Sequence, residues 1–517
     1  MNFVSDLIRK TEIRYKYAFL SVFFFGLFSQ GMGLFNKYSM HDDVQYFFHR
    51  GKVIKWGRWG SYLLIKGESR LFGDGTYSLP VFNGFITIIC VGIALCLLID
   101  LLHIRSTVLC VLLGGIAISF PVITSLYGFM YTAHNYGYAL LFSVLGPYLI
   151  LRKNRWYYIL LGIWLMAFAT GIYQAYIPVI LSTFLLTLIR LFHDAECRED
   201  RIPLYKKTGI IFLSGIAFVG LYFLLTYASL RYFNETLTGY KSISSMGRLS
   251  VGVYLKRVLI AYKEFFNPTP DNVYDVFPGN IRFVNIALMI FAIPFIIKLL
   301  YSKRKDPVGA VIILVLLLLV PLAVNFIFVM IKSSDCWALM VYGKYMFFVL
   351  FAWLIETVLG DIHTVVARAA KAVCFGGLGL LLLMYCRFDN IVYLQEDLIR
   401  AESQRYFSTL VTRIQSVEDY DSWKYVCYIG KPEPGRNDNS VENIQELDHI
   451  LLPPVHYGLQ NALKVSFRHY LKFWCGFTAH EADPAYFKDL PEVKAMPRYP
   501  AEGSIKVIND VVVVKFH

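Results

Sequence analysis

The chain has 517 residues, of which 56% are hydrophobic and only 17% are charged. Soluble domains carry about 25% charged residues, so this composition excludes an ordinary soluble enzyme. The formal net charge is +13. We assign the excess of cations to loops and lipid contacts of a membrane protein, because no nucleic-acid-binding motif is visible and a nucleic-acid partner is not expected.

The apolar residues are gathered into blocks that are long enough to cross a bilayer as helices, which takes about 20 residues. We predict an all-α polytopic membrane protein with eleven spans. The fifth and sixth are the least clearly separated. The predicted spans cover 17–35, 79–103, 107–126, 134–151, 156–172, 174–192, 209–229, 283–300, 308–330, 337–358 and 372–389.

The loops between these spans give the predicted orientation. Lys and Arg are denser in the loops on the side of the N-terminus, which predicts a cytoplasmic N-terminus. An odd number of spans then places the C-terminal tail outside. The outer loops after spans one and seven are also rich in cations. Either the topology is reversed or these cations bind an anionic group at the outer face, and we favour the second interpretation.

The tail differs in composition from the preceding chain, so we divide the protein into a membrane domain, 1–390, and a small extracytoplasmic α/β domain, 391–517. Apolar periodicity predicts an amphipathic helix over 391–416, with an apolar face made of Leu394, Leu398, Tyr406, Leu410 and Ile414, and another over 456–472. Residues 423–429 read as a strand. Residues 504–516 read as a hairpin with its turn at Asn509-Asp510. This domain either binds an acceptor glycan or covers a catalytic cavity.

Two carboxylates, Asp42 and Asp43, follow the first span, and the segment Trp56-Gly57-Arg58-Trp59-Gly60 comes soon after them. The amphipathic stretch over 41–66 predicts a pair of interfacial helices. Transfer of a sugar from a lipid phosphate needs a carboxylate base for the acceptor hydroxyl and a cation for the phosphate. Asp42 or Asp43 and Arg58 supply these groups. A helix cap and an interfacial anchor are the alternative roles of the carboxylates and of Arg58.

Further candidates for binding the donor phosphate or the sugar lie near the predicted outer face. Asp275 is instead predicted to be a surface carboxylate. For the polar candidates, structural hydrogen bonds, a solvated turn and snorkelling are the alternatives. The candidates are Lys55, Trp56, Trp59, His134, Tyr173, Gln174, Arg231, Lys241, Lys332 and Lys344.

The order of these motifs resembles the glucosyltransferase II-like family, which includes serotype-converting O-antigen glucosyltransferases and belongs to the GT-C class. The resemblance rests on the acidic pair after the first span and on the Gly-Arg-Trp segment. It also rests on Ile172-Tyr173-Gln174, on Pro321 with Asn325, and on the tail segments 496–500, 503–506 and 511–515. It extends over nearly the whole chain.

The resemblance implies an enzyme of the bacterial cell membrane that moves a hexose, with glucose expected, from a polyprenyl-phosphate sugar to a cell-surface glycan at the outer face. The acidic pair of the family corresponds to Asp42 and Asp43. Many GT-C enzymes have a Glu in this pair, so the base is left open between the two. We expect a metal-free mechanism without a cofactor. A flippase and a donor synthase are further partners that the resemblance allows. The alternative function is a lipid-linked sugar flippase.

Overall fold

The computed structural model describes residues 12–516, except 39–40, 46–47, 50–52, 74–75, 154, 239–248, 271–273, 361, 363, 419, 422–423 and 433–458. The chain divides into two compact units, each described here by itself. The first unit comprises residues 1–36 and 48–390. The second combines residues 37–47 with the tail, 391–517. The acidic pair therefore belongs to the same unit as the tail.

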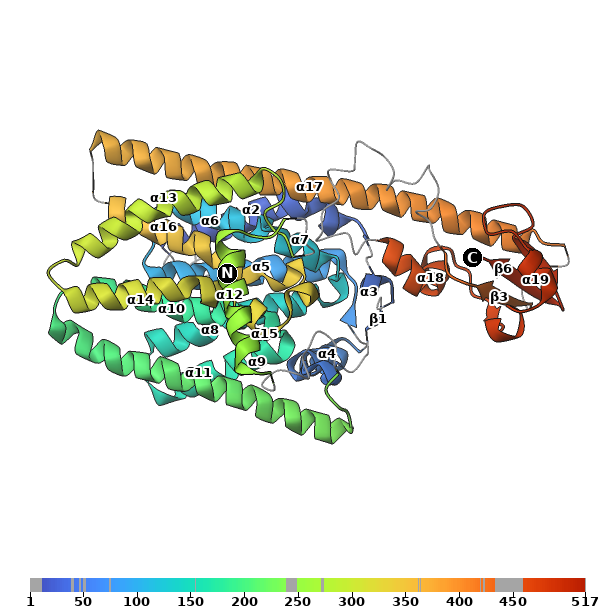
Figure 1. Ribbon diagram of the computed structural model, residues 1–517, viewed down its shortest axis with the longest axis horizontal. Coiled ribbons are helices and arrows are strands. Elements are labelled where there is room, and N and C mark those ends of the chain that lie inside the picture. The colour runs from blue at the N-terminus through green and yellow to red at the C-terminus, as the bar shows by residue number, and fades with distance from the viewer. Residues whose placement is uncertain are drawn as a thin grey trace, which may run out of the picture. The chain divides into compact units, whose positions relative to one another are not determined.

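The first unit consists of helices that pack side by side and bury apolar side chains between them (Figure 1). Helices α2 and α6 pack extensively against each other, as do α8 and α9. The helices are α2 (Ile13–Phe35), α5 (Pro80–Leu102), α6 (Thr107–Ser119), α7 (Pro121–Tyr127), α8 (Ala133–Arg152), α9 (Trp156–Ile172), α10 (Ile177–Asp194), α11 (Arg198–Phe233), α12 (Val251–Phe266), α13 (Ile281–Ser302), α14 (Pro307–Val324), α15 (Ile327–Met330), α16 (Met346–Leu359) and the first part of α17 (Val365–Gln415).

Local chemistry explains where several of these helices begin. The Ser106 side chain accepts a hydrogen bond from the Leu109 backbone N–H and caps α6. Asp306 accepts one from the Gly309 backbone N–H and caps α14, in which Pro307 takes the first position. Such residues satisfy N–H groups that have no partner inside the helix. Pro121 divides the third predicted span into α6 and α7, because proline cannot continue the hydrogen-bond ladder.

The structure confirms a mostly helical chain with several helices suited to a membrane. Nine helical segments among the described residues are long and apolar enough to cross one. Each of the eleven predicted spans contains a helix. The predicted spans 134–151 and 156–172 correspond to α8 and to the 17-residue α9, which fall outside the nine. The number eleven therefore stays a prediction.

The segment after the first span differs from the predicted pair of interfacial helices. It forms the short helix α3 (His41–Gln45), a two-residue strand β1 (Phe48–His49) paired with β2 (Thr76–Tyr77), a 3-10 turn η1 (Ile54–Trp56) and one longer helix α4 (Trp59–Phe72). Gly57 has a φ of 69° and separates η1 from α4. A left-handed residue cannot continue a right-handed helix, which explains the break.

An additional amphipathic helix, α12, lies in the second cation-rich loop and runs across the direction of α13 and α14 (Figure 1). One of its faces leaves Val251, Leu255 and Leu259 exposed. Arg257 on the other face is buried and donates to the backbone carbonyls of Val329 and Met330. A helix that runs across the membrane-spanning helices and exposes apolar residues is suited to lie on a membrane surface.

The second unit contains a four-stranded sheet in the order β4-β3-β6-β5. Strands β3 and β6 are parallel, whereas β5 and β6 form an antiparallel hairpin. The hairpin turn lies at Asn509 and Asp510, which have φ values of 52° and 62°. This turn was predicted, and it suits asparagine and aspartate. The elements are β3 (Tyr425–Ile429), α18 (Leu459–Trp474), β4 (His480–Glu481), α19 (Pro491–Ala495), β5 (Ile505–Ile508) and β6 (Val511–Lys515).

The last predicted span and the predicted helix over 391–416 form one continuous helix, α17. Its later part packs Phe407, Leu410 and Ile414 into the core of the second unit, together with the inner faces of β3, β6 and α18. The predicted apolar face is correct at Leu410 and Ile414 but wrong at Leu394, which is 48% exposed. Val392, Tyr393 and Glu396 are buried there instead.

Candidate active site

The acidic pair lies in the first turn of α3, where the two aspartates have different surroundings. Asp43 is fully buried and forms an ion pair with Lys37. The next residue, Val44, is also fully buried and joins the core of the second unit. Asp42 is only half-buried. Adjacent residues of a helix point in different directions, so burial of Asp43 turns Asp42 away from the core.

A third carboxyl group, Glu396 of α17, belongs to the same region. Its side chain is 2% exposed, and its Oε1 atom makes no hydrogen bond within the part of the chain that the structure describes. Glu396 lies beyond the predicted span 372–389. Burial, and then the negative charge of Asp43, raise the pKa of Glu396 to about 8. Glu396 is therefore mostly protonated at neutral pH.

Glu396 was not among the predicted site residues. The only signal in the sequence is the polar pair Gln395-Glu396, which follows the apolar stretch of the predicted helix. Both side chains are buried. The residues that neighbour Glu396 in the sequence do not indicate that the charge of Asp43, near the other end of the chain, acts on it.

Arg58 of the first unit is held by aromatic side chains from three parts of the chain. Its guanidinium carbon lies 4.8 Å from the centre of the Tyr173 ring and 5.8 Å from that of Trp56. One terminal nitrogen donates to the Tyr136 hydroxyl over 3.3 Å. Tyr136 and Tyr173 are stacked, with ring centres 4.4 Å apart. Cation–π contacts of this kind orient a guanidinium without neutralising its charge.

Gln174 connects this cluster to the neighbouring helices. Its side-chain nitrogen donates to the backbone carbonyl of Trp56 over 2.7 Å and to the Tyr222 hydroxyl over 3.0 Å. A Cβ atom on Gly57 would lie 2.6 Å from that hydroxyl, so only glycine fits there. The structure thus brings together four residues singled out from the sequence, namely Trp56, Arg58, Tyr173 and Gln174. Tyr222 was not predicted, because it lies within an apolar span.

Two other predicted residues of this segment have different surroundings. Trp59 is 4% exposed and packs on α9, with its ring 5.8 Å from that of Phe168. A Cβ atom on Gly171 would lie 2.5 Å from the Trp59 ring, so the glycine allows this contact. Protein therefore occupies most of the Trp59 surface. Lys55 is exposed, and its ammonium lies 5.2 Å from the centre of the Trp56 ring.

The remaining candidates are dispersed. His134 is 2% exposed, and its Nε2 lies 2.8 Å from the Glu68 carboxylate. Arg231 is exposed in the last turn of α11, and Lys332 is exposed at the start of a 3-10 turn, Ser333–Asp335. Lys241 lies outside the described residues. A binding role for each of these side chains stays a prediction.

Lys344 is buried in the 3-10 turn Tyr342–Tyr345 that precedes α16. Its ammonium lies 5.4 Å from the centre of the Phe277 ring and makes no hydrogen bond to the residues that the structure covers. Asp275, predicted as a surface carboxylate, is instead buried and bonded to Arg282 over 2.7 Å. The Arg282 charge explains how the carboxylate tolerates burial. Buried charges at the end of a span suit a polar ligand.

The described residues contain no group of three or more His, Cys, Asp and Glu side chains that could hold a metal ion. The metal requirement stays a prediction.

Comparison with known proteins identifies a family. The family described as glucosyl transferase GtrII matches residues 31–351. That region contains every predicted site residue, from Asp42 to Lys344, whereas Glu396 and the sheet of the second unit lie outside it. No curated protein and no solved structure matches the chain.

Proposed function

Because the chain belongs to the GtrII glucosyl transferase family, we propose that it moves a glucosyl group from a polyprenyl-phosphate donor to a hydroxyl of a cell-surface glycan. Membership supports glucosyl transfer, and the apolar helices are consistent with a multi-pass membrane protein. The donor, the acceptor and the outer location of the reaction are our proposals. A donor of this class requires a synthase that makes it and a flippase that brings it to the outer face.

The observation that carries the mechanism is the unequal burial of the acidic pair. Asp43 is enclosed and paired with Lys37, so its charge is already engaged inside the protein. Asp42 is the half-buried member, and we assign it the role of general base. We assign Asp43 the role of a positioning residue that fixes the first turn of α3. This assignment distinguishes two residues that the sequence leaves equivalent.

In the proposed reaction, the acceptor oxygen attacks the anomeric carbon while Asp42 removes its proton. The bond from the anomeric carbon to the phosphate oxygen breaks, and the electron pair leaves with polyprenyl phosphate. The charge that develops on the phosphate is stabilised by Arg58. One displacement inverts the configuration at the anomeric carbon. Because side chains supply both the base and the cation, we propose that turnover needs no metal.

The experiment that tests this proposal uses the purified full-length chain in proteoliposomes. Glucosyl polyprenyl phosphate is offered together with an O-antigen-type glycan, and products are identified by mass in buffer with EDTA. We expect a glycan heavier by one hexose and an equal amount of polyprenyl phosphate. Translocation of the donor across the bilayer with no glycan product would overturn the proposal in favour of a flippase.

A further inference from the structure

An apolar groove lies between α10 and α11 of the first unit. Its volume is about 730 Å³, which is the size of a ligand site. Its walls include Phe184 of α10, together with Ile216 and Phe223 of α11. Ile216 is 57% exposed and Phe223 is 47% exposed, on a helix suited to cross a membrane. The groove is therefore open toward the lipid that surrounds these helices.

One end of the groove is polar. Gln174 and Tyr222 line it there, and they are hydrogen-bonded to each other. Gln174 also bonds the Trp56 carbonyl, and Gly57 packs against both side chains. The next residue is Arg58, whose guanidinium lies on Tyr173. A cation thus follows directly on Gly57, the residue that packs against the two polar side chains of the groove.

Two glycines of α11 leave space in the groove where other residues would place a side chain. Gly215 and Gly220 of α11 both line it, and a Cβ atom added to either would meet no atom within 4 Å. Elsewhere in this unit, glycines such as Gly171 admit a neighbouring side chain. At Gly215 and Gly220 the space beside the glycine is unfilled by the described residues.

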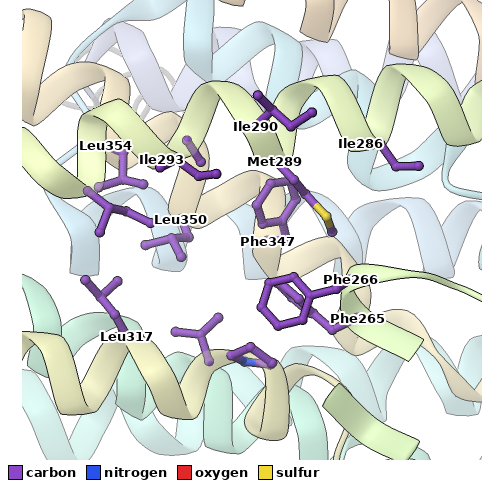
Figure 2. A pocket seen from close by; sticks show the side chains of 14 residues that line it. Phe265, Phe266, Ile286, Met289, Ile290, Ile293, Leu317, Phe347, Leu350 and Leu354 are labelled. Atoms are coloured by element: carbon purple, nitrogen blue, oxygen red, sulfur yellow. The ribbon is translucent and has the colours of Figure 1, made fainter. Parts of the chain in front are cut away.

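A second cavity, of about 270 Å³, provides a contrast. Figure 2 shows its side chains, including Met289 and Ile293 of α13, Leu317 of α14 and Phe347 of α16. All the residues that line it are apolar, and all are described. With no polar end, it does not distinguish an anionic lipid from the neutral interior of a bilayer.

We propose that the groove between α10 and α11 binds the part of the donor's isoprenoid chain next to the phosphate, with the phosphate beside Arg58. This inference rests on the proposed function, because it takes the donor to be a polyprenyl phosphate. A branched apolar chain attached to an anion matches an apolar groove whose polar residues, Gln174 and Tyr222, contact the segment that carries Arg58. The groove then gives the enzyme affinity for the lipid and places the sugar at the end where Arg58 lies.

The test introduces large side chains into the groove at these two glycines. Gly215→Phe and Gly220→Phe place a ring in the unfilled space, and replacing glycine with a larger residue also favours the helix. Gly209→Phe is the matched control, because it lies on the same helix, also meets no atom within 4 Å, and does not line the groove. The KM is measured for a glucosyl donor with a long polyprenyl chain and for one with a short chain that ends before the groove.

We expect both groove variants to raise the KM for the long-chain donor by about tenfold or more, since several buried methylene groups lose their site. The KM for the short-chain donor should change little, and Gly209→Phe should match the wild type for both donors. If wild type and the three variants share one KM for the long-chain donor, the groove inference is wrong while the proposed function stands. If the wild type transfers no sugar, the proposed function fails.

A photoreactive polyprenyl phosphate without sugar tests the groove independently of catalysis. We expect crosslinks to α10 and α11 that are lost in Gly215→Phe and kept in Gly209→Phe. Crosslinks confined to other helices, or displacement of the probe by ordinary phospholipid at equal concentration, would overturn the inference.

Discussion

The acidic region around α3 and the arginine region around η1 hold their charges in opposite ways. In the first, Asp43 is buried against Lys37, and Glu396 adds a carboxyl group beside it. In the second, the faces of Tyr173 and Trp56 and the hydroxyl of Tyr136 surround Arg58. The ion pair fixes a buried carboxylate, whereas the aromatic rings orient the plane of a guanidinium. In our proposal the fixed carboxylate is therefore structural and the arginine binds the ligand.

The largest effect is expected from Asp42→Asn, which removes the proposed base and keeps the shape of the side chain. Loss of a general base typically costs about 10²–10⁴ in rate. We expect kcat to fall in that range in proteoliposomes while the protein still inserts and unfolds at the wild-type temperature.

Asp43→Asn is the matched comparison within the pair. It removes the carboxylate charge that pairs with Lys37, and removal of one partner of a buried pair is destabilising. We expect a lower unfolding temperature than that of Asp42→Asn. If instead Asp43→Asn is the stable variant that loses turnover, the two assignments must be exchanged.

The next largest effect is expected from Arg58→Gln, which removes the cation near the donor phosphate. Removal of one electrostatic contact to the developing charge costs about 10²-fold in kcat. Arg58→Lys should recover only part of this, because an ammonium cannot reproduce the planar contact with Tyr173. Lys66→Gln removes an exposed cation from neighbouring α4 and serves as the control. Equal losses in the two glutamine variants would show a general charge effect instead.

A smaller effect, on stability, is expected at Glu396. Glutamate has an ordinary pKa of about 4.3, and burial and Asp43 raise the pKa of Glu396 to about 8. The folded protein therefore binds this proton more tightly than the unfolded chain, so its stability falls as pH rises from about 4 to about 8. Glu396→Gln removes the titrating carboxyl group and therefore this decrease in stability with pH.

We expect the unfolding temperature of Glu396→Gln, relative to wild type, to be higher at pH 8.5 than at pH 5. Thermal unfolding of both proteins over this range measures the difference. Glu418→Gln replaces an exposed glutamate of the same unit and provides the control. A difference that does not vary with pH would show that Glu396 is not protonated in the folded protein.

The smallest effect is expected from labelling one cysteine, which tests the predicted orientation of the chain in the membrane and should leave turnover unchanged. Cys197 is the exposed cysteine among the nine, and it precedes α11 on the side predicted to be cytoplasmic. We expect a membrane-impermeant maleimide to label it in permeabilised cells but not in intact cells. Cys197→Ser identifies the labelled site. Labelling in intact cells would reverse the topology and place both charged regions inside.

Features set by nearby residues could be predicted from the sequence. The apolar blocks gave the helices because crossing a bilayer is a local requirement, and Asn509-Asp510 gave the hairpin turn because both residues tolerate the left-handed backbone. Trp56, Arg58, Tyr173 and Gln174 were predicted one by one, whereas Tyr136 and Tyr222 were not. The assembly of these residues was not predicted, because it depends on contacts such as that between Gln174 and Trp56, far apart in sequence.

Features set by distant partners could not be predicted. In the part of α17 that follows residue 390, the buried face includes Val392, Tyr393 and Glu396, whereas apolar spacing alone indicated Leu394. Tyr393 stacks on Tyr38, and Glu396 responds to Asp43, so residues from the beginning of the chain decide which face is buried. The unequal burial of Asp42 and Asp43 also depends on residues far apart in the sequence, because the adjacent Val44 packs into the core formed by the tail.

The role of Asp42 as the base is tested most directly by replacing the acceptor with azide, a nucleophile that has no proton to remove. Asp42→Ala is given glucosyl polyprenyl phosphate in proteoliposomes, and both possible products are quantified by mass. We expect glucosyl azide to form at a rate that rises with azide concentration, while transfer to the glycan hydroxyl is lost. Full transfer to the hydroxyl by Asp42→Ala, or no azide product from a variant that still binds donor, would contradict the account.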